Sequence, residues 1–120
     1  MARKRDITAD DKFFRGEDKV LKVTIDDGAT PPVAKDITTW TLAFTMRRSA
    51  GADEALITKT SASGITITNG PGGLCQVAIS DTDTASLTPG KYAYDVKRMT
   101  ADAEAILVYG TLTLLAEVTR

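Results

Sequence analysis

Apolar residues recur at every second position along most of this chain, which is the period of a pleated strand. The clearest example is residues 40–46, WTLAFTM, where large apolar side chains alternate with threonine and alanine. The alternation predicts strands over residues 21–25, 40–46, 56–60, 65–67, 75–79, 92–96 and 106–115. We therefore expect about seven strands and very little helix.

Turns rich in glycine, proline and aspartate separate these strands. Residues 69–73, NGPGG, predict a tight turn. A glycine-rich phosphate-binding loop is not favoured, because such a loop is followed by a helix, whereas residues 74–77 begin a strand. Residues 26–36 form a longer connection that suits a crossover between sheets or an exposed loop. The fold class predicted is all-β, an immunoglobulin-like antiparallel β-sandwich, with a barrel as the alternative.

One short helical turn is expected near residues 81–87. Ser80 or Asp81 can cap it, and Pro89 and Gly90 end it. Residues 87–94, LTPGKYAY, are similar to the corner before strand F of immunoglobulin-like domains. There a leucine plugs the sandwich and a tyrosine bonds to the backbone upstream.

The first residues break the alternation and carry clustered charge. We predict a flexible basic N-terminal arm over residues 1–12 and a single β-sandwich domain over residues 13–118. Arg3, Lys4 and Arg5 are candidate partner-binding residues, since clustered cations can neutralise phosphates or dock on a protein. Residues 1–22 also carry five acidic side chains and no Tyr or Trp for base stacking, which favours a protein partner over nucleic acid.

Two adjacent aromatics follow the predicted arm. Phe13 and Phe14 would point to opposite sides of an extended chain, so one can enter the core while the other meets a partner.

The last predicted strand is unusually apolar on both faces. We expect its core face to consist of Ile106, Val108, Leu112 and Leu114. Leu107, Tyr109 and Leu115 would then face outward and form an apolar stripe, a liability in a monomer. We expect the N-terminal arm or a neighbouring subunit to cover it, which makes Leu107 and Tyr109 candidate interaction residues.

Composition narrows the possible chemistry. The chain has 120 residues, 15 Lys and Arg against 16 Asp and Glu, no histidine and one cysteine. The missing histidine removes Ser-His and Cys-His relays and His-ligated metals, and a single cysteine removes disulfide frameworks. No apolar stretch approaches the roughly 20 residues of a membrane span. We expect no enzyme, no cofactor, no metal, no membrane and no small-molecule substrate.

The remaining candidate sites have structural explanations. Residues 81–83 and the Asp26-Asp27 pair lack the glycine and distant glutamate of a calcium loop, so we read them as turn and cap residues. Cys75 lies in an apolar alternation, which favours a buried inert thiol. Trp40, Tyr92 and Tyr94 share faces with apolar neighbours, so core packing is favoured over a sugar-stacking platform.

The order of these features carries a family resemblance. The quoted features are an RGED segment at 15–18, the strands at 20–25, 40–46, 65–68 and 73–79, SDTDT at 80–84, Leu87-x-x-Gly90-x-Tyr92-x-Tyr94-x-Val96 and Gly110-x-Leu112-x-Leu114. This order, over residues 14–116, resembles the small immunoglobulin-like β-sandwich domain at the N-terminus of upper baseplate proteins of tailed phages. The basic first dozen residues are not part of that pattern, nor is a long receptor-binding part.

The resemblance implies a non-enzymatic bacteriophage virion structural protein, made in the host cytoplasm. Such a protein would act by assembly in a tail, baseplate or neck, as a homo-oligomer and with other virion proteins. A capsid decoration protein is a close alternative. A glycan-binding or adhesin-like module is the alternative of another class.

Overall fold

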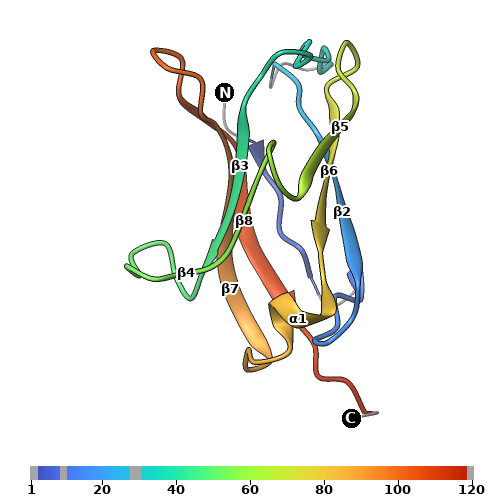
Figure 1. Ribbon diagram of the computed structural model, residues 1–120, viewed down its shortest axis with the longest axis vertical. Helices are drawn as coiled ribbons and strands as arrows, with labels where there is room; N and C mark the ends of the chain where they lie inside the picture. Colours follow the sequence, from blue (N-terminus) through green and yellow to red (C-terminus); the bar gives the residue numbers. More distant parts are fainter. Residues whose placement is uncertain (1–2, 9–10, 28–30, 119–120) are drawn as a thin grey trace.

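Two facing sheets form the molecule in this computed structural model, which describes residues 3–8, 11–27 and 31–118 (Figure 1). The larger sheet has five strands in the order β1 (Arg3–Lys4), β8 (Ala105–Leu114), β7 (Gly90–Arg98), β3 (Leu42–Arg47) and β4 (Ala55–Thr60). The smaller sheet has three strands in the order β2 (Lys19–Thr24), β6 (Leu74–Ile79) and β5 (Ile65–Asn69).

All seven predicted strands are present, and they form a sandwich of two sheets rather than a barrel. The chain crosses between the sheets from β2 to β3, from β4 to β5 and from β6 to β7. The resulting strand neighbours match the B-E-D and G-F-C order of immunoglobulin-like sandwiches. The predicted all-β sandwich is therefore confirmed.

The core lies between the inner faces of the two sheets. Alternation along β3 buries Leu42, Phe44 and Met46, and alternation along β7 buries Tyr92 and Tyr94. Further core residues from the other strands are Leu21, Val23, Ile57, Ile65, Cys75, Val77, Ile79, Val108, Leu112 and Leu114. Burial raises the pKa of the Cys75 thiol to about 11, as desolvation disfavours the thiolate.

The predicted crossover and the predicted glycine-rich turn pack against each other. The amide of Ile25 donates to the carbonyl of Gly73 at 2.8 Å, and that of Ile37 donates to the carbonyl of Gly70 at 2.8 Å. Gly73 has a φ of 71°, and a Cβ there would lie 2.2 Å from the Ile25 carbonyl oxygen. Only glycine fits at this position. Residues 28–30 of the crossover lie outside the described residues.

The predicted helical turn and aromatic corner are both present. Helix α1 (Asp81–Thr84) is a single turn, shorter than expected, and the Ser80 amide donates to the Asp83 carboxylate at 2.8 Å. The Tyr92 hydroxyl donates to the carbonyl of Thr88, four residues upstream. This is the tyrosine bond expected from residues 87–94.

The predicted facing of β8 is wrong at its start. Val108 pairs with Val96, but Ile106 pairs with Lys97, so Leu107 is an extra residue in a β-bulge. The bulge shifts the alternation by one residue, which turns Leu107 into the core with 8% exposure. Ile106 shares the outward face with its partner Lys97.

The described part of the predicted arm is not a separate segment outside the sandwich. Strand β1 pairs in parallel with β8, with Arg3 opposite Val108 and Lys4 opposite Tyr109. Further along, Ile7 forms a parallel bridge with Leu112 and is only 1% exposed. Residues 1–2 and 9–10 lie outside the described residues. The charge pattern concealed this strand, because only Ile7 supplies an apolar anchor among residues 3–8.

The arm lies between the two sheets' edges. The Arg5 guanidinium donates to the carbonyl of Lys22 on β2 at 2.6 Å, while the Arg5 amide donates to the Tyr109 carbonyl on β8 at 2.8 Å. Figure 1 shows the arm running between β8 and β2. It therefore closes this open side of the sandwich and pairs the edge of β8.

A tyrosine and a glycine permit this close approach. The Tyr94 hydroxyl donates to the Arg5 carbonyl at 2.5 Å, and Gly110 is the cross-strand partner of Tyr94. A Cβ on Gly110 would lie 2.2 Å from the Arg5 carbonyl oxygen. Burial raises the pKa of Tyr94 to about 12, so its hydroxyl stays protonated and keeps donating.

Gly110→Ala should therefore displace the arm. We expect the free energy of unfolding to fall by about 1–3 kcal/mol, the usual cost of overpacking, in a denaturant titration. Gly51→Ala is the matched control, because a Cβ on Gly51 has no atom within 4 Å. Equal stability of the Gly110→Ala and Gly51→Ala variants would contradict the close packing of the arm.

Candidate interaction face

The outward side of the five-stranded sheet, which we call the outer face, is the broadest regular surface of the molecule. One cross-strand row spans all five strands. From β4 to β1 its members are Thr58, Thr45, Asp95, Tyr109 and Lys4. Asp95 on β7 is thus the central residue of the row, flanked by a hydroxyl side chain on each side.

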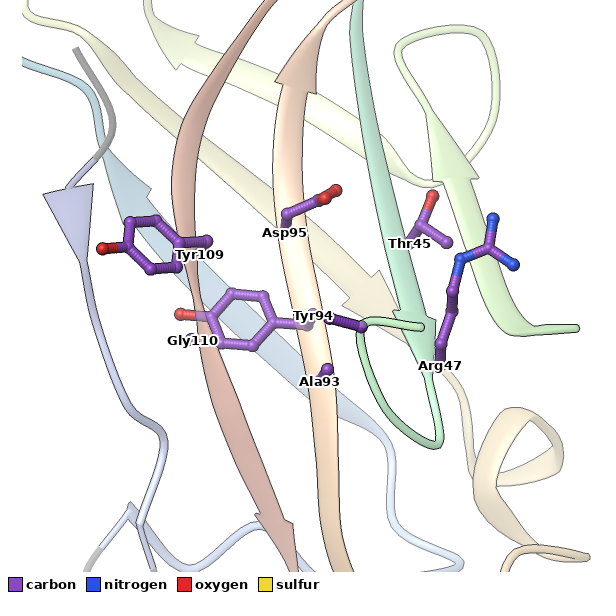
Figure 2. A pocket seen from close by; sticks show the side chains of 8 residues that line it. Thr45, Arg47, Ala93, Tyr94, Asp95, Tyr109 and Gly110 are labelled. Carbon is purple, nitrogen blue, oxygen red and sulfur yellow. The ribbon is translucent and has the colours of Figure 1, made fainter. Parts of the chain in front are cut away.

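Shallow hollows lie on this face because some outward side chains are small. The hollow shown in Figure 2 has a volume of about 170 Å³, and Ala93, Asp95 and Tyr109 contribute to its lining. Ala93 also lines a neighbouring hollow of about 390 Å³, towards Lys91 and Thr111. The outer face is therefore shaped to receive protruding side chains.

A third hollow extends the face towards the other end of the sheet. Its volume is about 560 Å³, and it includes Ala43, Lys97, Met99 and Ile106 in its lining. Met99 is 45% exposed. The bulge that turns Leu107 inward therefore places a different apolar side chain, Ile106, on the outer face.

The charge at the centre of the outer face is unusual. Burial raises the pKa of the Asp95 carboxyl, and the nearby cations Lys97 and Arg47 oppose that shift only in part. Among the described residues, Asp95 has no hydrogen-bond or salt-bridge partner. A partly desolvated carboxylate without a hydrogen-bond partner is less favourable in the folded chain than in water.

Arg47 fixes the rim of the face at the end of β3. Its guanidinium donates to the Asp53 carbonyl at 2.7 Å, which holds the loop between β3 and β4 beside the hollow. The basic side chains whose charges act on Asp95 are Lys97 and Arg47.

The basic residues predicted to bind a partner contact this chain itself. Arg3 donates to the Asp26 carboxylate from Nε at 3.2 Å and from Nη2 at 2.9 Å. The Lys4 ammonium lies 3.9 Å from an Asp6 carboxylate oxygen. With Arg5 bonded to β2, the described arm is engaged with its own domain rather than presenting three free cations.

Of the aromatic and apolar residues predicted to bind a partner, two are buried, one is half-buried and one is exposed. Phe13 is 2% exposed, and both it and Leu107 lie in the core, so neither side chain is open to a partner. Phe14 is half-buried beside Leu115, which it meets in a parallel bridge. Tyr109 is 43% exposed on the outer face, where we predicted it.

Other candidate chemistry has structural partners. The Asp83 carboxylate accepts a salt bridge from Lys59 at 2.8 Å. The described residues contain no group of three or more His, Cys, Asp or Glu that could hold a metal ion. Trp40 is partly buried, and the Arg98 guanidinium lies 4.0 Å from its ring centre, so its face is covered. Within the part of the chain described here, no helix is long and apolar enough to cross a membrane.

The sequence does not mark Thr45, Ala93 or Asp95 as candidate site residues. Its only signal was the outward half of each alternation, in which residues 93, 95 and 97 are Ala, Asp and Lys. The row that joins them depends on strand register, which a single sequence does not specify.

Asp95→Asn should stabilise the chain at neutral pH. Because the folded state raises the carboxyl's pKa, ionisation costs the folded chain more than the unfolded one. That cost is absent below the ordinary carboxyl pKa of about 4 and is complete above the raised value. We expect thermal unfolding at about pH 7 to occur at a higher temperature than in the wild type, and the gain to vanish near pH 3.

Asp53→Asn, on the exposed loop beside the same face, is the control for removing one negative charge. A gain at both pH values, or no gain at pH 7, would show that Asp95 is not a destabilising carboxylate.

Comparison with known proteins adds no assignment. No protein-family model matches the sequence, and no curated protein is significantly similar to it.

Proposed function

We propose that this chain is a non-enzymatic structural protein of a tailed-phage virion, in its tail, baseplate or neck. It acts by packing its outer face against neighbouring subunits, other copies of itself or other virion proteins. The proposal combines the resemblance of residues 14–116 with the geometry of the outer face.

The observation that carries the assembly role is the position of Asp95. Its carboxylate is partly desolvated, unpaired within the described residues and central in a row across five strands. A partner cation, or a donor group that reaches the hollow, would compensate the cost that the isolated chain bears. Packing against a subunit would therefore offset the free-energy cost of this carboxylate, which no contact within the described residues offsets fully.

The surface around Asp95 suits a contact between proteins. Thr45, Ala93 and Tyr109 present hydroxyl, methyl and aromatic groups, and Ile106 and Met99 add apolar area nearby. Tyrosine and methionine are enriched in interface centres. The tyrosine corner and the strand order also agree with the immunoglobulin-like type of domain named by the resemblance.

Two alternatives predict different partners. A capsid decoration protein would use the same contacts, with the phage head in place of the tail. A glycan-binding module would use Tyr109, which is exposed beside a carboxylate, as a stacking surface for a sugar ring. Binding on a glycan array that Tyr109→Ala abolishes would favour the glycan-binding module.

Ala93→Glu should prevent assembly, since it fills two hollows on the central strand of the outer face. Ala78→Glu is its matched control, because Ala78 is exposed on β6, the central strand of the other sheet. In light scattering we expect oligomers for the wild type and Ala78→Glu, and a monomer for Ala93→Glu. Oligomers of equal mass for all three proteins would contradict assembly through the outer face.

The virion assignment has its own test. We expect mass spectrometry of purified phage particles from the genome that encodes this chain to detect it at a fixed stoichiometry. Particles that lack the chain would contradict the proposed function.

A further inference from the structure

The contacts that hold the arm on β8 are all distant in sequence. The Ile7 amide donates to the Thr111 carbonyl at 2.8 Å, and the Thr113 amide donates to the Ile7 carbonyl at 2.7 Å. A side-chain contact of the arm also joins residues distant in sequence, because the Asp6 carboxylate accepts a hydrogen bond from the Thr111 amide at 3.0 Å. An identical arm from a second copy would satisfy every one of these groups equally well.

The chain after the arm is anchored independently of it. Phe13 is in the core, and its carbonyl accepts from the Leu115 amide at 2.8 Å. The Arg15 guanidinium forms a salt bridge with Glu117 at 2.9 Å and also donates to the Leu87 carbonyl at 3.2 Å. Residues from Phe13 onward can therefore keep their places when residues 3–7 leave.

In the connection between these two parts, the described residues Thr8 and Asp11 bond to each other. The Thr8 amide donates to the Asp11 carboxylate at 2.8 Å, and the Asp11 amide donates to the Thr8 carbonyl at 3.0 Å. Lys12 has a φ of 54°, a left-handed conformation that is strained for any residue other than glycine. Short strained connections of this kind favour the exchange of segments between copies, because extension relieves the strain.

We propose that residues 3–7 are exchanged between neighbouring copies, so that β1 of one copy pairs with β8 of the next. The inference rests on the proposed assembly function and specifies one contact within it. When residues 8–12 are extended they span at most about 18 Å, so exchange requires copies that are already in contact.

The position of the arm fits this arrangement. Lys4 ends the cross-strand row of the outer face, beside the exposed Tyr109. An exchanged arm would therefore join two subunits along the border of the face through which we propose that they pack. The backbone pairing would add strand-to-strand hydrogen bonds to that contact.

Disulfide trapping between different chains tests the exchange. Lys4→Cys is placed on one chain and Tyr109→Cys on a second chain with a C-terminal mass tag, and the two are co-expressed. Neighbouring strands lie about 4.8 Å apart, within the range of Cα separations that a disulfide spans. We expect oxidation to give a linked species containing both chains, at twice the chain mass, which reduction separates. Cys75 is buried and does not compete.

Two controls calibrate this result. Lys4→Cys with Thr113→Cys is out of register by four residues, or about 13 Å, and should give little of the linked species. A single chain carrying both Lys4→Cys and Tyr109→Cys reports whether the pair can bond. A bridge within that chain, with no mixed-chain species above the out-of-register control, would overturn the exchange.

A pair of glycine variants provides a readout without cysteines. Lys12→Gly relieves the strain in the closed connection, so we expect light scattering to show a larger monomer fraction than in the wild type. Asp102→Gly is the matched control, because Asp102 has a φ of 64° in the connection between β7 and β8, outside the arm and its connection to the domain. Equal monomer fractions for both variants would contradict the exchange.

Wild-type oligomers that persist without mixed-chain disulfides would leave the proposed function standing and remove only the exchange.

Discussion

The hydrogen bond from the Tyr94 hydroxyl to the Arg5 carbonyl is the contact on which the closed edge of this sandwich depends. It reaches across β8 at Gly110, where a side chain would meet the arm's backbone. Because the Arg5 carbonyl is taken by Tyr94, the Thr111 amide bonds to the Asp6 carboxylate. Hydrogen bonding to the Thr111 amide lowers the pKa of Asp6, which favours the ionised acceptor. Tyr94, Gly110 and Asp6 thus replace one backbone hydrogen bond of a regular parallel strand pair, the bond from the Thr111 amide to the Arg5 carbonyl.

Closing the edge in this way decides what remains available for binding. Arg3 and Arg5 turn to Asp26 and β2, so two of the three cations that the sequence suggested as a docking element are engaged within the chain, while Lys4 stays on the outer face near Asp6. The arm also extends the large sheet to five strands, with Asp95 at its centre. The surface that remains is broad, carries a central carboxylate and is hollowed over Ala93. Those properties, rather than a reactive group, are the basis for proposing an assembly role.

Periodicity predicted the seven long strands, the short helix and the tyrosine corner, because each depends on residues close together in sequence. The strand pairing of the arm and the bulge were not predicted, and both involve β8. A bulge is an extra residue in one strand of a pair, so it depends on how that strand pairs with its neighbour. The run ILVY at 106–109 therefore does not show whether Ile106 or Leu107 faces the core until its pairing with β7 is known. Pairing of the arm likewise depends on groups about 100 residues away. The outer face was missed for the same reason, since its row exists only once four strand registers are fixed.

Native-state hydrogen exchange of the full-length chain tests the central claim most directly. The Ile7 and Thr113 amides each bond across the junction between the arm and β8. If the arm is an integral strand of the sandwich, both amides will be protected to a degree comparable with the paired amides of β7. Exchange of Ile7 and Thr113 at the rate of unstructured peptide, with β7 still protected, would show that the edge is open and that the arm is not part of the fold.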